Sequence, residues 1–316
     1  MFLAIEIGGT KLQLAVGNAK SDSLLQLERR DVYPEDGAEG IRKQIAQIAP
    51  GLISTHGVRS IGIGFGGPVD PYNGKIIRSY HVEGWVDYPL KDWCEQSLGI
   101  PSYLGNDSDL AGLGEAKFGA GKGGQVVFYS NVGTGIGGAL VIAGELYLGG
   151  SGGASEIGHF RPSIHADTPD QIIESHSSGW GMTAVARHRL EHPRSGDAPW
   201  ISDILKRCAG KPENLTAKIL ATALSEGNAL AADVFEQGIR MYGWALAQVI
   251  NLLGPNIVVI GGGVPLVGET FYLGPLRQQI NRYIMEPRHD TYEVKPAALG
   301  EEMVLHGALA LASTMS

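Results

Sequence analysis

Cysteine is scarce in this sequence, where only Cys94 and Cys208 occur among 316 residues. The two lie far apart and show none of the short spacings that metal-binding cysteines use. Such cysteine usage is typical of a protein that stays in a reducing compartment. We therefore expect a cytoplasmic protein whose two thiols are chemically inert.

Long apolar runs and a basic excess are also missing. No run is long enough to cross a bilayer, and the first seven residues read as a strand rather than a signal peptide, because Glu6 interrupts them. The formal net charge of −8 argues against nucleic acid as the main partner. An acidic protein can still bind phosphates through backbone N–H groups at turns. We therefore expect small-molecule partners, with no membrane and no nucleic acid.

Glycine, by contrast, is abundant, with 46 residues. The glycines occur at turns beside apolar runs, where the backbone must bend tightly or approach a ligand. Hydrophobic residues make up 43% of the chain and its mean hydropathy is near zero, which indicates a soluble globular protein. A chain of 316 residues is too long for one compact core and suits two lobes.

The periodicity of apolar residues predicts an α/β protein whose second half is mainly helical. The glycine-rich residues 119–124 mark a lobe boundary. We place residues 1–118 and about 300–316 in a small N-terminal lobe, and residues 119–299 in a larger C-terminal lobe. The expected strands are 2–7, 12–16, 60–64, 101–104, 125–130, 139–143 and 256–260. The expected helices are 40–53, 90–98, about 108–118, 229–253, 275–284 and 302–314, the last of which we expect to pack on the first lobe.

One arrangement occurs twice. Residues 2–16 read as a strand, a glycine turn and a strand, and residues 125–143 repeat this pattern about 125 residues later. Each copy opens one predicted lobe, which indicates a duplicated fold.

Both glycine turns suit a phosphate group, because successive N–H groups point toward one place and no side chain blocks it. One such turn alone is more often an ordinary hairpin, whereas two at the heads of two lobes could clamp a triphosphate from both sides of a cleft. Residues 133–138 also match the G-x-G-x-x-G spacing of dinucleotide-binding folds. A β-type segment follows them where that motif requires a helix, so we reject this match.

Several polar residues have two possible roles. Asn106 and Asp107 stand where a strand gives way to a helix, so either residue could simply cap the helix. A carboxylate at such a strand end, facing a phosphate turn, could instead accept a hydroxyl proton during phosphoryl transfer. Glu156 and His159 could bind adjacent sugar hydroxyls or form a solvated turn, and Glu174 is equally ambiguous.

Six segments, taken in order, resemble the motifs of the ROK family, which comprises sugar kinases and sugar-responsive repressors. Each motif is weak alone, but their common order is highly specific. The resemblance runs from residue 3 to about residue 312. The six segments are Glu6–Lys11, Gly66–Asp70, Gly105–Asp107, Gly133–Gly138, Glu156–His159 and Ile260–Gly263.

This resemblance implies a two-lobed, ribonuclease-H-like α/β fold of the actin and hexokinase class, with ATP and Mg²⁺ in the interlobe cleft. It implies a sugar kinase that phosphorylates a hexose or hexose derivative, usually at O6, and that is commonly a homodimer or tetramer. Asp107 would be the catalytic base. The implied sugar contacts are Asn106, Gly67, Glu156, His159 and Glu174. The implied nucleotide contacts are Gly8, Gly9, Thr10, Lys11, Gly133, Thr134, Gly135, Gly261, Gly262 and Gly263.

The chain departs from the family pattern at a metal site. ROK kinases often bind zinc through the histidine of their Glu-x-Gly-His motif and three cysteines, but residues 160–174 contain no cysteine. We therefore expect no structural zinc and interpret His159 as a sugar contact. A replacement site built from His159, His165, Asp167 and His176 would have irregular spacing.

Two further departures concern single residues. The first motif usually opens with Asp, whereas this chain has Glu6, so a carboxylate that positions metal-bound water would lie about one methylene further into the cleft. His81 stands near the place where the family often has a sugar-binding Asn. If His81 replaces that contact, the preferred sugar differs from glucose.

The resemblance leaves two alternative functions. ROK repressors carry a DNA-binding helix-turn-helix ahead of the kinase-like part, whereas this chain starts at the first strand and has no segment that reads as a basic recognition helix. The other alternative is a sugar-binding regulatory protein with weak or no kinase activity, suggested by Glu6 and the missing cysteines. The retained Asp107 argues against it, because binding alone needs no base.

Overall fold

The computed structural model describes residues 1–314, and the chain folds into two compact units. Unit 1 contains Met1–Tyr129, Ala139–Ser155 and the described chain from Ala297 onward, and unit 2 contains Ser130–Gly138 and Glu156–Pro296. The sequence placed residues 119–299 in the second lobe as a whole. The structure instead groups 119–129, 139–155 and 297–299 with unit 1.

One buried carboxylate accounts for part of this difference. Glu115 lies fully buried near the end of helix α3 (Asp107–Phe118). Its two oxygens accept the backbone N–H groups of Ala120 at 2.8 Å, Ala298 at 2.9 Å and Leu299 at 2.8 Å. Because these bonds fix both segments to α3, neither behaves as a free linker.

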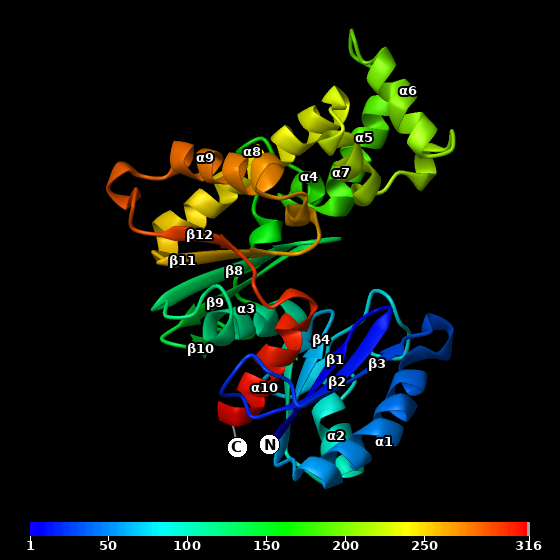
Figure 1. The fold of residues 1–316 in the computed structure, drawn as a ribbon, viewed down its shortest axis with the longest axis vertical. Helices are drawn as coiled ribbons and strands as arrows, with labels where there is room; N and C mark the ends of the chain where they lie inside the picture. Colours follow the sequence, from blue (N-terminus) through cyan, green and yellow to red (C-terminus); the bar gives the residue numbers. More distant parts are fainter. Residues whose placement is uncertain (315–316) are drawn as a thin grey trace. The chain divides into compact units, whose positions relative to one another are not determined.

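Unit 1 is built on a five-stranded sheet with the strand order β3-β2-β1-β4-β7 (Figure 1). The first three strands form an antiparallel meander, and β4 and β7 run parallel to β1. A glycine turn joins β1 to β2, as the sequence predicted. The strand bounds are β1 Phe2–Ile7, β2 Lys11–Gly17, β3 Gln26–Asp31, β4 Ser60–Phe65 and β7 Ser102–Asn106. A separate two-stranded sheet contains β5 (Val69–Asp70) and β6 (Lys75–Ile76).

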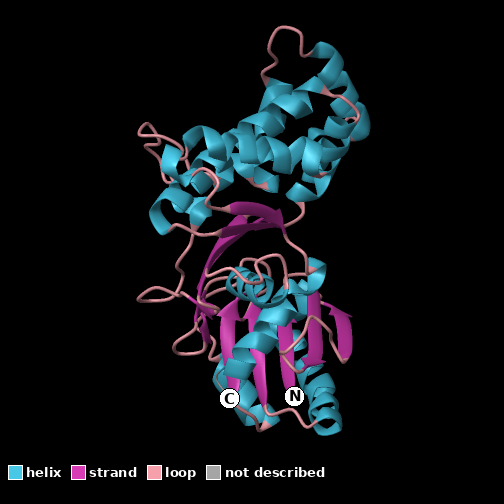
Figure 2. Ribbon diagram, turned by 60° about the vertical axis from the view of Figure 1, so that its left-hand side comes forward, coloured by secondary structure: helices cyan, strands magenta, loops and turns pink. Residues whose placement is uncertain are grey.

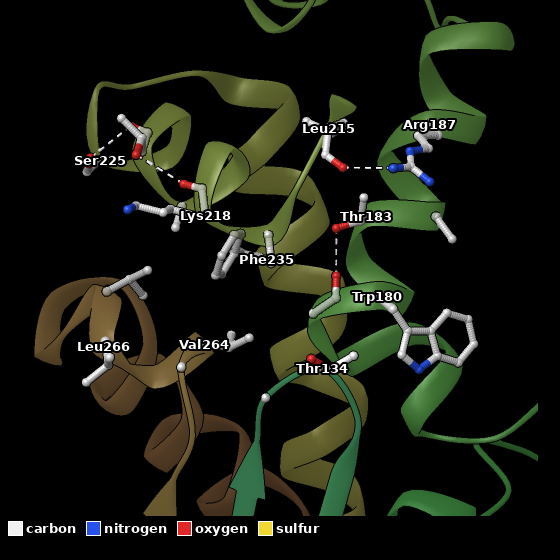
Figure 3. Close-up of a pocket in the computed structure, with 18 residues that line it drawn as sticks. Thr134, Trp180, Thr183, Arg187, Leu215, Lys218, Ser225, Phe235, Val264 and Leu266 are labelled. Atoms are coloured by element: carbon white, nitrogen blue, oxygen red, sulfur yellow. Dashed lines mark hydrogen bonds between the residues drawn. The ribbon is translucent and has the colours of Figure 1, made fainter. Parts of the chain in front are cut away.

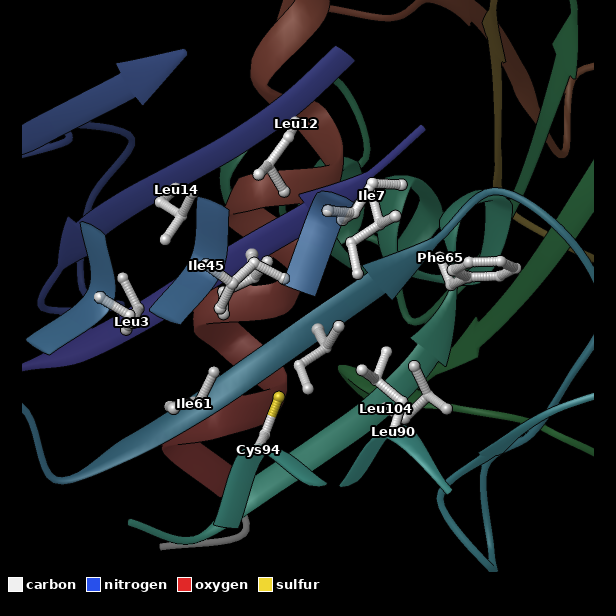
Figure 4. Close-up of a cluster of buried hydrophobic side chains, with 14 of the residues drawn as sticks. Leu3, Ile7, Leu12, Leu14, Ile45, Ile61, Phe65, Leu90, Cys94 and Leu104 are labelled. Atoms are coloured by element: carbon white, nitrogen blue, oxygen red, sulfur yellow. The ribbon is translucent and has the colours of Figure 1, made fainter. Parts of the chain in front are cut away.

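Two helices cover one face of this sheet, α1 (Gly37–His56) and α2 (Leu90–Leu98). The strands alternate, so every second side chain of β1, β2 and β4 points into one apolar cluster with them. Figure 4 shows Leu3, Leu14, Ile45, Ile61 and Cys94 in this cluster. Burying these side chains is the main stabilising contribution on this side of the sheet.

The opposite face packs against α3 and the last helix, α10 (Met303–Thr314), which confirms that the chain end returns to the first lobe. Glycine is required in β4 because the α10 backbone lies so close. A Cβ atom on Gly62 would stand 1.9 Å from the Ala308 carbonyl oxygen. The two helices also meet closely, since a Cβ atom on Gly307 would stand 1.8 Å from the Leu110 carbonyl oxygen.

The second five-stranded sheet has the order β10-β9-β8-β11-β12. This order corresponds position by position to β3-β2-β1-β4-β7, so the duplication predicted from the two glycine turns is confirmed. The chain passes from unit 1 to unit 2 within β8 and returns within β9. The bounds are β8 Val126–Val132, β9 Ile136–Ile142, β10 Glu145–Leu146, β11 Ile257–Gly261 and β12 Glu293–Pro296.

Unit 2 is mainly helical, as expected (Figure 2). Its longest helix, α8 (Ala229–Leu253), has the predicted bounds: the Asn228 side chain caps its first turn, and Gly254 ends it in the left-handed conformation at φ 62°. The other helices are α4 Glu174–Ser177, α5 Gly179–Glu191, α6 Ala198–Arg207, α7 Ala217–Ser225 and α9 Gly274–Tyr283. No helix within residues 1–314 combines the length and apolar character that a membrane span requires.

Both cysteines should resist thiol reagents in the folded protein. Cys94 is fully buried in α2, and burial raises the pKa of its thiol to about 12; Cys208 is 2% exposed. Because the thiolate is the reactive form, we expect neither residue to react with an aromatic disulfide reagent at pH 8, whereas two thiols per chain should react at once in denaturant. Rapid reaction of one thiol in the native protein would contradict this expectation.

Candidate active site

Asp107 lies where β7 ends and α3 begins. The preceding residue, Asn106, caps the helix: its Oδ1 accepts the N–H groups of Ser108 at 2.8 Å and Asp109 at 3.4 Å. The Asn106 amide also donates to the Gly67 carbonyl at 2.9 Å. Of the two residues, Asn106 therefore has a capping role, while its contact with a sugar stays a prediction.

The Asp107 carboxylate lies beside the first glycine turn. Its Oδ2 is 3.5 Å from the position that a Cβ atom on Gly66 would take, and the Gly8 Cα is 3.8 Å from that position. Burial raises the pKa of Asp107, although the backbone N–H of Ser108 donates to Oδ1 at 2.8 Å and opposes this effect. A more basic carboxylate next to a phosphate-type turn is a suitable proton acceptor.

The first glycine turn is a tight hairpin. The Gly8 N–H donates to the Lys11 carbonyl at 2.9 Å, and the Thr10 carbonyl accepts the N–H of Val32 at 2.9 Å. The exposed side chain of His81 lies against the turn, since a Cβ atom on Gly9 would stand 2.9 Å from the His81 Cβ. Unit 1 thus brings together the 8–11 turn, Gly67, His81, Asn106 and Asp107, while the roles of these residues stay predictions.

Glu6 belongs to a chain of polar contacts across the same unit. Its Oε2 accepts the amide of the fully buried Gln13 at 2.7 Å, and Gln13 in turn accepts Arg29 at 2.8 Å. Arg29 also donates to Glu302 at 3.1 Å. Burial raises the pKa of Glu6; Gln13 and Lys11 oppose this shift, and the negative charge of Asp107 adds to it. Two carboxylates therefore share this region.

The second glycine turn is held by helix α5 in unit 2. The N–H groups of Gly179 and Trp180 donate to the carbonyls of Gly133 at 2.9 Å and Thr134 at 3.3 Å. Gly262 lies against the end of β8: a Cβ atom there would stand 2.4 Å from the Val132 carbonyl oxygen, and its φ is 93°. The structure thus places Gly262 against the end of β8, directly before the 133–135 turn, while the contact of Gly261–Gly263 with a nucleotide stays a prediction.

A cavity of about 1160 Å³ opens beside these two glycine segments within unit 2 (Figure 3). Its walls are mostly apolar, and most of its polar side chains are already engaged: Thr183 donates to the Gly179 carbonyl, and Arg187 donates to the Leu215 carbonyl. The lining includes Gly133, Thr134, Trp180, Lys218, Phe235, Gly263, Val264 and Leu266. An apolar cavity of this size suits a flat ring system.

Sequence reasoning missed the helical walls of this cavity. Trp180, Lys218 and Phe235 come from three helices and belong to no motif. An aromatic residue at helical spacing reads as core, so no local signal could have identified them.

The remaining predicted sugar contacts meet at the start of β9. Gly158 packs on the Ile136 backbone, since a Cβ atom there would stand 2.4 Å from the Ile136 carbonyl oxygen. Glu174 accepts the Ile136 N–H at 2.7 Å. Glu156 and His159 flank Gly158 with exposed side chains. Unit 2 therefore brings these three predicted residues together, while their contact with a sugar stays a prediction.

The segment without cysteines is closed by an arginine. The Arg161 guanidinium donates to the carbonyls of Thr168 at 2.6 Å, Pro169 at 3.1 Å and Gln171 at 3.2 Å. Within residues 1–314, no three or more His, Cys, Asp and Glu side chains are grouped so that they could hold a metal ion. Hydrogen bonds from Arg161 thus connect the start of this cysteine-free segment to its later residues.

Comparison with known proteins shows the family to which this chain belongs. A family model described as the ROK family matches residues 2–315. A glucokinase from Thermotoga maritima is 31% identical over 315 residues, which cover 98% of this chain and 96% of the relative.

Two solved structures are similar over nearly the whole chain. The ROK family glucokinase from Streptomyces griseus, in complex with glucose and AMPPNP, has a TM-score of 0.80 and 30% identity, with 99% of each chain covered. The ROK hexokinase from Thermus thermophilus has a TM-score of 0.83 and 27% identity, with 99% of this chain and 98% of that chain covered. These similarities confirm the fold class expected from the sequence.

Proposed function

This chain is a sugar kinase that belongs to the ROK family, and we propose that it transfers the γ-phosphoryl group of ATP to the O6 hydroxyl of a hexose or hexose derivative. The observation that carries the finer assignment is the position of Asp107. Its carboxylate is partly buried and lies beside the 8–11 turn. A base must stand next to the transferred group in this chemistry.

In the proposed reaction, Asp107 accepts the proton of the sugar hydroxyl. The freed oxygen forms a bond to the γ-phosphorus while the bond between that phosphorus and the β,γ-bridging oxygen breaks, and ADP leaves. Burial, which raises the pKa of Asp107, makes the carboxylate a stronger base than an exposed aspartate. Asn106 fixes the start of α3, so the carboxylate keeps one position at the strand end.

The nucleotide would bind through backbone groups and an apolar pocket. Gly8 to Lys11 and Gly133 to Gly135 form turns suited to phosphate oxygens; the N–H groups of Gly8 and Gly133 close these turns, so the later residues of each turn would meet the phosphates. The adenosine would occupy the cavity beside Gly261 to Gly263, where the apolar walls suit a purine ring. The AMPPNP complex of the Streptomyces griseus relative supports the proposal that this chain binds ATP.

The sugar would be held by side chains that hydrogen-bond hydroxyl groups. Asn106 and His81, with the Gly67 backbone, come from unit 1, and Glu156, His159 and Glu174 come from unit 2. Carboxylates and imidazoles accept hydrogen bonds from hydroxyl groups, and adjacent acceptors select the arrangement of those groups on the ring.

The fold class implies Mg²⁺, and the residues present fit it. Mg²⁺ usually binds one or two carboxylates together with phosphates and water. Glu6 and Asp107 are two carboxylates in one partly buried region, and the negative charge of Asp107 contributes to the raised pKa of Glu6. Glu6 would hold the ion through water, and a bound Mg²⁺ would offset charge on the phosphates.

A substrate panel tests the proposal. Purified protein is incubated with ATP, Mg²⁺ and single hexoses or N-acetylhexosamines while ADP release is followed, and the product of the best sugar is assigned by NMR. We expect sugar-dependent ADP release and a 6-phosphate. Tight sugar binding by calorimetry without turnover of any sugar would favour the regulatory alternative.

A further inference from the structure

Glu174 makes a contact that recognition of a sugar does not require. Its Oε2 accepts the N–H of Ile136, the residue directly after the second glycine turn, at 2.7 Å. The fit is close, because a Cβ atom on Gly135 would stand 2.6 Å from the same oxygen and 3.8 Å from Oε1. A bond from an N–H group to an ionised carboxylate is about twice as strong as a neutral one.

The backbone that carries Glu174 is anchored on both sides. The N–H of Ile173 donates to the Phe160 carbonyl at 2.8 Å. The hydroxyl of Ser177, which is 1% exposed, donates to the Gly238 carbonyl in α8 at 2.8 Å. The carboxylate therefore extends from a fixed base and can hold another segment in place.

The segment that it holds is the second glycine turn. The same stretch of chain also donates to this turn from Gly179 and Trp180, so residues 174–180 hold it at three points. Thr134, at the centre of the turn, lines the cavity (Figure 3). The conformation of a turn that faces the nucleotide thus depends on a residue predicted to face the sugar.

We propose that Glu174 is a positioning residue for the 133–136 turn, and that through it the binding of sugar and the binding of nucleotide are energetically coupled. This inference rests on the proposed function. One carboxylate oxygen holds the turn, while Oε1 has no hydrogen-bond or ion-pair partner within residues 1–314. A sugar hydroxyl that donates to Oε1 orders the side chain, so less ordering remains when the nucleotide binds. By linkage, the nucleotide raises sugar affinity by the same factor.

Four proteins test the positioning role by calorimetry, with AMPPNP and Mg²⁺ and no sugar. Glu174→Gln keeps an oxygen that can accept the Ile136 N–H, whereas Glu174→Asp keeps the charge but is one methylene too short. We expect Kd for AMPPNP to stay within about threefold of wild type in Glu174→Gln. It should rise about tenfold in Glu174→Asp and Glu174→Ala, the effect of losing one such bond. Glu236→Ala, an exposed glutamate of α8, is the matched control and should bind like wild type.

The order of these affinities decides the question. A role that depended only on negative charge would make Glu174→Asp bind like wild type and Glu174→Gln bind weakly, and that result would overturn the proposal. Equal affinity in all variants would overturn it as well. Should Glu174→Ala fail to fold, the two conservative variants give the same decision.

The coupling is tested by repeating the titrations with saturating glucose. Glucose should lower the Kd for AMPPNP at least about threefold in wild type and have no effect in Glu174→Asp. The same glucose effect in both proteins, or none in wild type, would overturn the coupling. A failure of the proposed kinase function would show differently: no sugar would give turnover, while the sugar-free nucleotide series would keep its predicted order.

Discussion

Replacing Asp107 by asparagine should lower kcat for sugar phosphorylation by about 10²- to 10⁴-fold, the usual contribution of a general base. Asparagine keeps the shape of the side chain and can still accept the Ser108 N–H, but it cannot take up a proton. We therefore expect KM values for ATP and sugar to change only a few fold. The measurement is steady-state kinetics with the best sugar of the panel.

A matched substitution and the pH profile make this prediction specific. Asp92→Asn alters an exposed aspartate of α2 in the same unit and should leave kcat unchanged. In wild type, kcat/KM should fall at acid pH, as protonation of Asp107 proceeds around its raised pKa. Wild-type turnover in Asp107→Asn would show that another group accepts the proton.

The same substitution should not destabilise the protein at neutral pH. The pKa of Asp107 is raised above the ordinary value of about 3.9, so the folded state disfavours the ionised form. Protonated Asp107 therefore contributes fully to the stability of the folded protein at pH values below the ordinary pKa. This contribution is lost as the pH rises through the raised pKa of the folded state. Asp107→Asn should therefore be at least as stable as wild type at pH 7, and its relative stability should decrease as pH is lowered toward 4. Urea titrations at several pH values measure this.

Gly307→Ala should destabilise unit 1 by at least about 3 kcal/mol, the upper end of ordinary overpacking. The added Cβ atom would stand 1.8 Å from the Leu110 carbonyl oxygen, so a backbone segment must move rather than a flexible side chain. Helices α3 and α10 would separate, and α10 would lose close contact with the sheet. A lower urea midpoint, followed by circular dichroism, is the expected result.

Gly51→Ala is the control for this substitution. Gly51 also lies inside a helix, α1, but a Cβ atom there would meet nothing within 4 Å. Alanine favours the helix over glycine, so this variant should gain about 0.5–1 kcal/mol. If Gly307→Ala raised the midpoint as Gly51→Ala does, helix propensity rather than close packing would govern Gly307.

Local sequence signals predicted much of the fold. The apolar period predicted α8 over residues 229–253, and Gly254 stops it as expected; the structure adds that Asn228 caps its start. The repeated glycine turns predicted the duplication that the two sheet orders confirm. In both cases the signal lies within a few residues of the feature it specifies.

Features that depend on distant contacts were not predictable. The edge strand β3 is polar and largely half-buried or exposed, so it lacks the alternation that identifies a strand. The contact between Glu174 and Ile136 joins residues 38 positions apart. Similarly, Glu115 fixes residue 120, within the 119–124 segment that the sequence predicted as a lobe boundary. The roles of the individual site residues and the oligomeric state stay predictions.

The position of α10 has a consequence for biosynthesis. This helix packs on a sheet whose first strand, β1, is synthesised before unit 2, whereas α10 itself is synthesised after unit 2. The part of the sheet face that α10 covers therefore stays exposed until every residue of unit 2 has been made. A nascent chain should thus complete its second unit before its first, and early termination should yield a product that exposes an apolar sheet to chaperones.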